Sequence, residues 1–141
     1  MSTILAPSRP ELIAAAFTTL ARQIDALRSA DDYEPERLGQ LPSLTLLFTQ
    51  ISQDDVDTGA YTENTWTFRV NLYLPLHDYK GAQRDLMRLL PEVLAITRRN
   101  PSLSGTCSFA VIADDGSEPV FATEEKFVRK SLRLTAESSE N

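Results

Sequence analysis

The segment from Trp66 to Leu74 constrains the fold most, because its side chains alternate between apolar and mainly polar. This period of two predicts a strand with one face in a core and the other face wet or shared with a partner. Pro75 ends the strand, and Asp78 suits the N-cap of a following helix. Apolar residues then recur at helical spacing, at Ala82, Leu86, Leu89, Leu90, Val93 and Ile96. A helix packed on a sheet is therefore expected.

The residues before this strand predict a helix, a loop and another strand. Ser8 and Pro10 are typical of a helix start. An apolar stripe follows at helical spacing, at Ile13, Phe17, Leu20, Ile24 and Leu27. Residues 29–42 are rich in Asp, Glu, Pro and Gly, which favours a connecting loop. Residues 43–52 carry apolar groups on both faces, as a partly covered strand does.

The residues after the second helix predict a turn and two more strands. Pro91 is expected to kink the helix. Residues 100–105 are expected to end it in a turn from which Leu103 folds back onto the core. A strand is expected over 106–113, a hairpin turn over 114–117 and a last strand over about 125–135. The terminal residues 1–8 and 136–141 are expected to be flexible.

The order of these elements predicts the fold class. A chain of 141 residues with 42% hydrophobic content fits one domain, residues 1–141. The short polar turns between adjacent strands favour antiparallel pairing. We therefore expect an α+β fold: a single domain with a mainly antiparallel sheet of about four to five strands and two helices packed on one face.

Charge and targeting signals argue against several classes of function. The formal net charge of −6 and the pI near 4.8 disfavour nucleic-acid binding, because binding phosphates requires an excess of Lys and Arg. Residues 1–10 lack the features of a secretory signal, and no stretch approaches the ~20 apolar residues of a membrane span. We expect a cytoplasmic protein that does not contact a membrane. Cys107 is the only cysteine, which rules out an internal disulfide.

No pattern in the sequence predicts a catalytic site. His77 is the only histidine and precedes Asp78, but neighbours in sequence generally point apart, and Asp78 is better explained as a helix cap. Cys107 lies in an expected strand without a basic neighbour, so an inert, partly buried thiol is expected there. We expect no enzyme activity. The alternative requires one of these three residues to meet another polar group in a pocket.

Two acidic segments are the best candidates for binding a cation, because clustered carboxylates suit Ca²⁺ or Mg²⁺. The first contains Asp54, Asp55 and Asp57, and the second contains Asp114 and Asp115. Neither has the spacing of a helix-flanked calcium loop, so solvated acidic turns are expected instead. The glycines are isolated and form no phosphate-binding loop. No metal and no cofactor are predicted.

Basic and acidic side chains are segregated along the sequence. Basic residues collect in the second helix and the last strand, and acidic residues collect near 54–57 and 114–125. If acidic loops of one copy contact the basic surface of the next, the contact is head-to-tail and can close into a ring. The candidate interface residues are Arg69, Tyr73, Arg84, Arg88, Arg129, Arg133, Asp54, Asp55, Asp57, Asp114 and Asp115.

The order and length of the elements over roughly residues 9–135 resemble the bacteriophage tail terminators, also called tail completion or minor tail proteins of the U type. The resemblance includes the N-terminal amphipathic helix, the strand after Pro42, the long alternating strand over 63–74, the helix from about Tyr79, and the turn before the next strand. Only that turn is carried over, as a structural element formed by Asn100, Pro101, Leu103 and Gly105. Ser104 departs from the second glycine common in relatives.

The resemblance implies a structural virion protein without catalytic residues. Such a protein forms a homohexameric ring on the end of the tail tube, stops polymerisation of the tube protein, and presents the surface to which the head-tail connector attaches. DNA passes through the lumen without specific binding, and assembly takes place in the host cytoplasm. The alternatives are another neck or connector component, a tube subunit, or a non-viral α+β adaptor domain that binds a peptide along a sheet edge.

Overall fold

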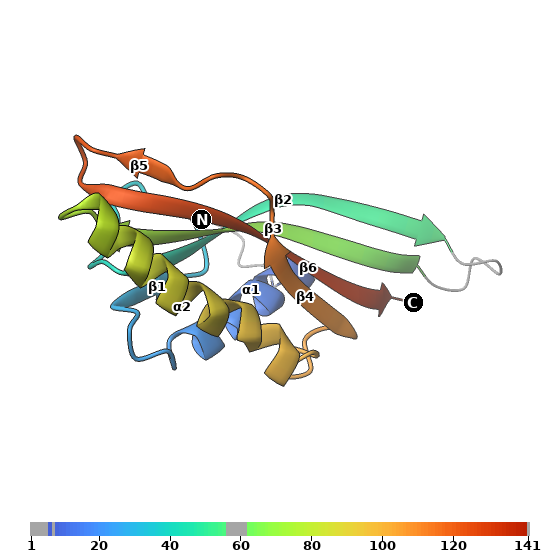
Figure 1. Cartoon of the computed structure of the whole chain (residues 1–141). Coiled ribbons are helices and arrows are strands. Elements are labelled where there is room, and N and C mark those ends of the chain that lie inside the picture. Colours follow the sequence, from blue (N-terminus) through green and yellow to red (C-terminus); the bar gives the residue numbers. More distant parts are fainter. Residues whose placement is uncertain (1–5, 7, 56–61, 141) are drawn as a thin grey trace.

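Two helices and six strands make up the part of the chain described by the computed structural model, which covers residues 6, 8–55 and 62–140 (Figure 1). The fold is α+β as expected, with one strand more than predicted. In chain order the elements are α1 (Arg9–Ala21), β1 (Ser29–Asp31), β2 (Ser43–Asp55), β3 (Thr62–Pro75), α2 (Tyr79–Arg99), β4 (Phe109–Asp114), β5 (Val120–Ala122) and β6 (Phe127–Glu140).

The strands form one mainly antiparallel sheet in the order β1-β2-β3-β6-β4, and β5 also pairs with β6. Only β1 and β2 are parallel. The central strand β3 pairs with β6 along its whole length, from Thr62 opposite Glu140 to Pro75 opposite Phe127. The far ends of β2, β3 and β6 extend beyond the helices (Figure 1). We call this extension the arm and define it as residues 50–55, 62–66 and 136–140.

Both helices pack on one face of the sheet, as the sequence predicts. The core-facing residues of β3 alternate with its polar residues, and they meet the apolar stripes of α1 and α2 in one hydrophobic cluster. Its largest fully buried side chains are Phe17, Ile13, Leu44, Leu46, Leu72, Leu74, Leu103, Leu132, Leu134, Val70, Val93 and Val128. Neither of the two described helices covers the opposite face of the sheet.

The helix starts follow the expected caps. Ser8 precedes α1, and its backbone N–H and hydroxyl both donate to the carboxylate of Glu11. At the start of α2, the carboxylate of Asp78 accepts a 2.6 Å hydrogen bond from the backbone N–H of Gly81. The helix α2 continues through Pro91 to Arg99.

The first helix is shorter than its apolar stripe. It ends at Ala21, and Ile24 and Leu27 pack against the core from the turns that follow. In these turns the N–H of Gln23 donates to the carbonyl of Leu20, and the N–H of Ile24 donates to that of Ala21. The tighter turns keep both side chains on the core side after the helix has ended.

Four local predictions are wrong. The turn over 114–117 is not a hairpin, because β4 and β5 on either side of it both pair with β6 and not with each other. The expected loop over 29–42 contains the short strand β1, which pairs with residues 43–45. The expected strand over 106–113 begins only at Phe109, so Cys107 lies in the preceding turn. Residues 136–140, expected to be flexible, belong to β6, because the long strand β3 offers them a pairing partner.

Candidate functional site

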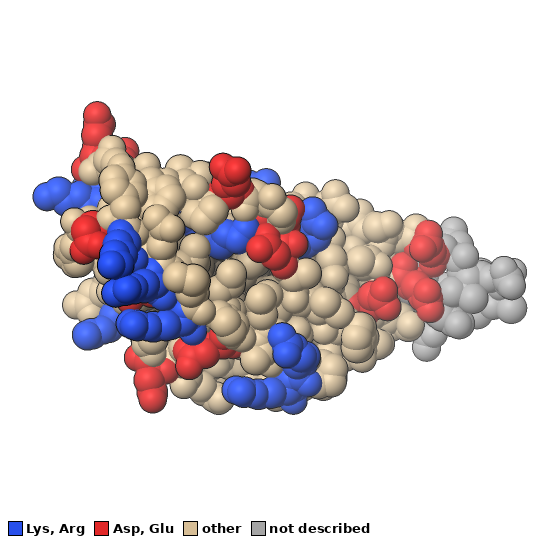
Figure 2. Space-filling view, viewed as in Figure 1, with Lys and Arg blue, Asp and Glu red and all other residues tan. Residues whose placement is uncertain are grey.

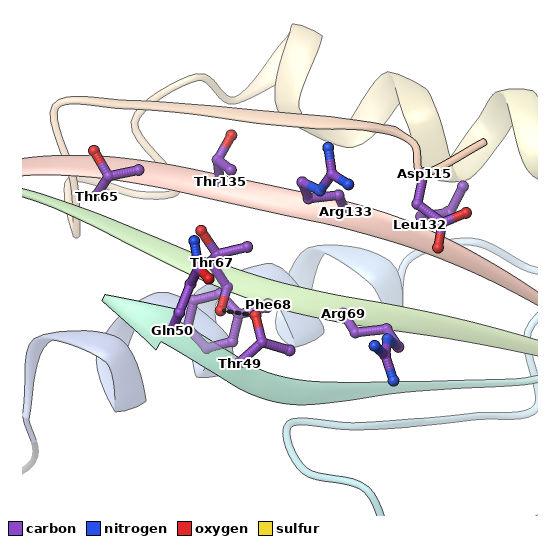
Figure 3. Close-up of a pocket in the computed structure, with 10 residues that line it drawn as sticks. All are labelled: Thr49, Gln50, Thr65, Thr67, Phe68, Arg69, Asp115, Leu132, Arg133 and Thr135. Atoms are coloured by element: carbon purple, nitrogen blue, oxygen red, sulfur yellow. Dashed lines mark hydrogen bonds between the residues drawn. The ribbon is translucent and has the colours of Figure 1, made fainter. Parts of the chain in front are cut away.

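The open face is the face of the sheet opposite the helices, formed by alternate residues of β2, β3 and β6. A shallow hollow of about 570 Å³ lies on it, and Figure 3 shows its lining side chains. They are mostly threonines and arginines from neighbouring strands: Thr49, Gln50, Thr65, Thr67, Phe68, Arg69, Asp115, Leu132, Arg133 and Thr135. A polar, half-open surface of this kind suits a macromolecular partner better than an enclosed small molecule.

Two like-charged pairs of opposite sign lie on the open face. Arg69 of β3 is directly opposite Arg133 of β6, and we call these residues the basic pair. Asp54 of β2 is directly opposite Glu63 of β3, and we call these residues the acidic pair. All four residues are exposed. Like charges opposite each other destabilise a sheet slightly, so neither pair is explained by the stability of the isolated chain.

The acidic pair lies on the arm, where further carboxylates gather. Glu137 of β6 lies opposite Thr65 and lines a small hollow of about 140 Å³ together with both members of the acidic pair. Figure 2 shows Asp and Glu side chains collected at this end of the molecule. Asp55 lies in β2, and Asp57 lies outside the described residues. The part of the chain that the structure describes contains no group of three or more His, Cys, Asp or Glu residues placed to hold a metal ion.

Tyr73 lies at the other end of the open face, but it is not on the surface. Its side chain is 5% exposed, and its hydroxyl donates a 2.6 Å hydrogen bond to Glu34 from the loop after β1. The same carboxylate accepts hydrogen bonds from Thr45 and from the amide of Asn71. Glu34 therefore covers this end of the sheet and takes Tyr73 out of any contact that requires an exposed side chain.

The pKa of Tyr73 reflects this arrangement. Burial is the main cause that raises it to about 12, and the hydrogen bond to Glu34 and the charge of that carboxylate raise it further. The nearby guanidinium of Arg129 acts in the opposite direction. Asn71 also accepts a 2.7 Å hydrogen bond from Ser131, which links the network to β6. The network holds the Glu34 loop onto β2, β3 and β6.

The acidic residues after β4 are already paired within the chain. The side chain of Lys130 is 5% exposed, and its ammonium lies 2.7 Å from Asp114 and 3.8 Å from Asp115. It also donates to the carbonyl of Ser117. The hydrogen bond from Lys130 is the main cause that lowers the pKa of Asp114. Burial alone would raise the pKa of Asp115, but hydrogen bonds from Ser117 and the charge of Lys130 lower it.

The basic residues of α2 lie in the helix layer, on the opposite side of the sheet from the open face. Arg84 and Arg88 are exposed, and Arg88 makes only a long 3.8 Å contact with Asp85. Figure 2 shows a concentration of Lys and Arg over this part of the molecule. The structure therefore divides the predicted interface residues between two surfaces. It brings Arg69 and Arg133 together, and it separates both from Arg84 and Arg88.

Of the residues considered for catalysis, His77 and Asp78 line one open hollow beside Thr123 and Lys126, and Cys107 lies elsewhere. His77 is exposed, and Asp78 caps α2. Cys107 is buried in the turn before β4, where its thiol lies 3.4 Å from the carbonyl of Ser102. Burial is the main cause that raises the pKa of this thiol, which favours its unreactive protonated form.

The turn over 100–105 has the structural role that its sequence indicates. Leu103, Ser104 and Gly105 have φ values of 45°, 59° and 82°, so three consecutive residues adopt the left-handed conformation. Leu103 is fully buried in the core, as expected. The guanidinium of Arg9 donates a 3.0 Å hydrogen bond to the carbonyl of Thr106, which joins α1 to the end of the turn.

Sequence reasoning missed three features of the site. No local sequence pattern indicates the role of Glu34, because it is one of several acidic residues in an expected loop. Glu63 and Glu137 could have been found, since the alternation of β3 places Glu63 on the same face as Arg69. Glu137 lies in a polar terminal segment for which the sequence predicts flexibility, so its place on the sheet depends on the pairing with β3.

Comparisons with known proteins give no family for this chain. No family model matches it, and no curated protein matches it significantly. Among the described residues, neither helix is both long and apolar enough to span a membrane.

Proposed function

We propose that this protein is a structural subunit of a phage tail, and that copies of it form a ring that closes the tail tube and joins it to the head connector. The observation that carries the proposal is the charge on the open face. A basic pair and an acidic pair occur on the same surface of one chain, and each is locally unfavourable unless a partner neutralises it. A second copy of the chain carries an acidic pair and a basic pair of its own, so it can neutralise both pairs of the first.

The order of the elements also supports this proposal. The helix, two long strands, second helix, left-handed turn and final strands follow the order on which the resemblance to tail terminators rests. The net charge of −6 suits a ring whose lumen lets DNA pass without holding it. In this role the protein would work in the virion, at the junction of tail and head, after assembly in the host cytoplasm.

The first experiment is a measurement of mass by light scattering coupled to size exclusion, over a concentration series with and without Mg²⁺. A hexamer is expected at high concentration or when tail tubes are present as a template. The decisive assay adds the purified protein to its polymerising tube protein and measures tube length by electron microscopy. Shorter tubes with a ring at one end are expected. Tubes of unchanged length without an added ring would contradict the proposal.

An adaptor domain is the second candidate, and one observation favours it. Beyond residue 45 the outer edge of β2 has no strand beside it among the described residues, and Leu47, Phe48 and Ile51 on this strand are exposed. Such an edge can accept an extended peptide as an added strand. A stable dimer or monomer that leaves tube growth unchanged would favour this candidate.

A further inference from the structure

The two charged pairs of the open face are arranged so that one copy can complement another. Glu63 and Arg69 are separated by six positions on the same strand, which corresponds to roughly 20 Å at 3.3 Å per residue. Both point to the open face, because side chains two positions apart share a face. The acidic pair therefore lies at the arm end of this surface, and the basic pair lies further along the same surface, toward Tyr73.

Neither pair is neutralised by another residue in the described part of the chain. The four side chains are exposed and make no hydrogen bond or ion pair with another described residue. Asp115, the carboxylate that lines the hollow beside Arg133, is already bound by Ser117 and lies close to Lys130. The other candidate acidic segment is thus used inside the chain, so of the two segments the arm is the one whose acidic pair has no described partner.

The surface between the two pairs permits a close approach. Beside the basic pair it is formed by Thr67 and Thr135, and nearer the arm by Thr65 and Glu137; the side chains of the three threonines are short and carry hydroxyl groups (Figure 3). Short side chains leave the hollow of about 570 Å³ next to the basic pair. A strand end from another molecule can lie in such a hollow without displacing a large side chain.

The same face already binds a carboxylate within the chain. Glu34 is held by donors from Thr45, Asn71 and Tyr73, two strand positions or more from Arg69. Residues of β2 and β3 thus supply donors to an acidic side chain that approaches from outside the sheet. The basic pair offers stronger, charge-assisted donors beside this position, and no described residue binds it.

We propose that Arg69 and Arg133 of one copy bind Asp54 and Glu63 on the arm of the neighbouring copy. This inference rests on the proposed ring and names the contact that closes it. The arm of each subunit lies on the open face of the next, so the contact is head-to-tail and repeats around the ring. The helix layer, with Arg84 and Arg88, remains outside this contact.

The test is a charge exchange between two variants. One carries R69E and R133E, and the other carries D54K and E63K. Each change replaces one like-charged pair by another, so the local repulsion within the sheet stays similar and both variants are expected to fold. Circular dichroism and thermal unfolding check this. The variant with R84E and R88E changes the net charge by the same amount as the first and serves as the matched control.

Each exchange variant alone is expected to lose the hexamer, both in solution and on tail tubes, with at least a tenfold weaker assembly. An equimolar mixture is expected to restore the hexameric mass, because acidic arms then meet basic faces and basic arms meet acidic faces. The control variant is expected to assemble like the wild-type protein.

Three results would overturn the inference. If both exchange variants form rings like the wild type, the contact lies elsewhere, although the ring itself stands. If the control variant alone fails to assemble, the helix layer forms the contact. If the mixture stops at two copies, the open faces meet in a two-fold dimer instead of head-to-tail. A wild-type protein that neither assembles nor shortens tubes would contradict the proposed function, which is a separate result.

Discussion

The hydroxyl of Tyr73 donates a 2.6 Å hydrogen bond to the carboxylate of Glu34, 39 residues earlier in the chain. This bond joins the loop after β1 to the central strand of the sheet. It also explains why a tyrosine on the polar face of β3 is buried although α1 and α2 both pack on the other face. The Glu34 loop takes the place of a second layer at this end of the sheet.

The substitution Tyr73→Phe is expected to lower the free energy of unfolding by about 1.5–3 kcal/mol, the usual contribution of a hydrogen bond to a charged group. The ring packing against Phe127 is kept, with centroids 5.2 Å apart, so the loss reports the hydroxyl. Urea denaturation at neutral pH measures it. Tyr33→Phe is the matched control, because Tyr33 is 59% exposed and should change stability by less than about 0.5 kcal/mol.

The same hydrogen bond predicts that the free energy of unfolding depends on pH. The pKa of Tyr73 is about 12 in the folded chain against the usual 10.0, so folding favours its protonated form. The corresponding stability is complete below pH 10 and is lost as the pH rises through 12. Urea denaturation at several pH values between 9 and 12 should show a steeper fall for the wild type than for Tyr73→Phe. Parallel curves would contradict this prediction.

The substitution Asp114→Asn is expected to destabilise the fold by about 1–3 kcal/mol, because it leaves the buried ammonium of Lys130 without its closest anion. The pKa of Asp114 is lowered from 3.8, so its contribution is present above that value and is lost as the pH falls through the folded pKa. Chemical denaturation at pH 7 and pH 3 tests both points.

The matched control for Asp114→Asn is Glu118→Gln, an exposed carboxylate in the same loop. It removes one negative charge without removing a contact to Lys130, and little change is expected. Equal effects of the two substitutions at pH 7 would show that general charge, and not the ion pair, stabilises this loop.

The parts of the fold that follow from local periodicity could be predicted from the sequence. The alternation in β3 and the apolar stripe of α2 give both the element and its buried face. The turn before β4 was also recognisable, because Asn100-Pro101 stops a helix and Gly105 favours a positive φ. These signals lie within a few residues of the structure that they predict.

The parts that depend on distant partners could not be predicted. The strand β1 exists because residues 29–31 find the edge of β2, and Glu34 is fixed by three residues from other elements. The end of β6 has a polar sequence typical of a flexible tail, but pairing with β3 overrides that preference. The basic and acidic pairs are likewise visible only when the register of the sheet is known.

The left-handed turn predicts an unequal response to two substitutions at Gly105, whose φ is 82°. Gly105→Ala is expected to cost about 1–2 kcal/mol, because a Cβ disfavours this conformation although no atom lies within 4 Å of the added group. Gly105→Asn should cost less, since asparagine tolerates positive φ. Thermal unfolding compares the two. Equal losses would show that the tolerance of asparagine for positive φ does not decide the cost at this position.

The end of β6 predicts that the C-terminal residues are needed for stability. Deletion of residues 136–141 should lower the free energy of unfolding by about 2–4 kcal/mol, since several cross-strand pairs with β3 are lost at about 0.2–1 kcal/mol each together with buried apolar area. The deletion also removes the hydrogen bond from Trp66 to Ser138, which is 2.9 Å long. An unchanged unfolding midpoint would mean that the pairing adds nothing.

Two single substitutions show whether this effect comes from specific packing. Ala136 is fully buried between β3 and β4, and Ala136→Asp is expected to cost more than about 3 kcal/mol, because it places a carboxylate in the core. Ser139 is exposed on the same strand, and Ser139→Ala should change stability by less than about 0.5 kcal/mol. A large difference between the two requires that β6 is ordered to its end, since a flexible tail would tolerate both changes equally.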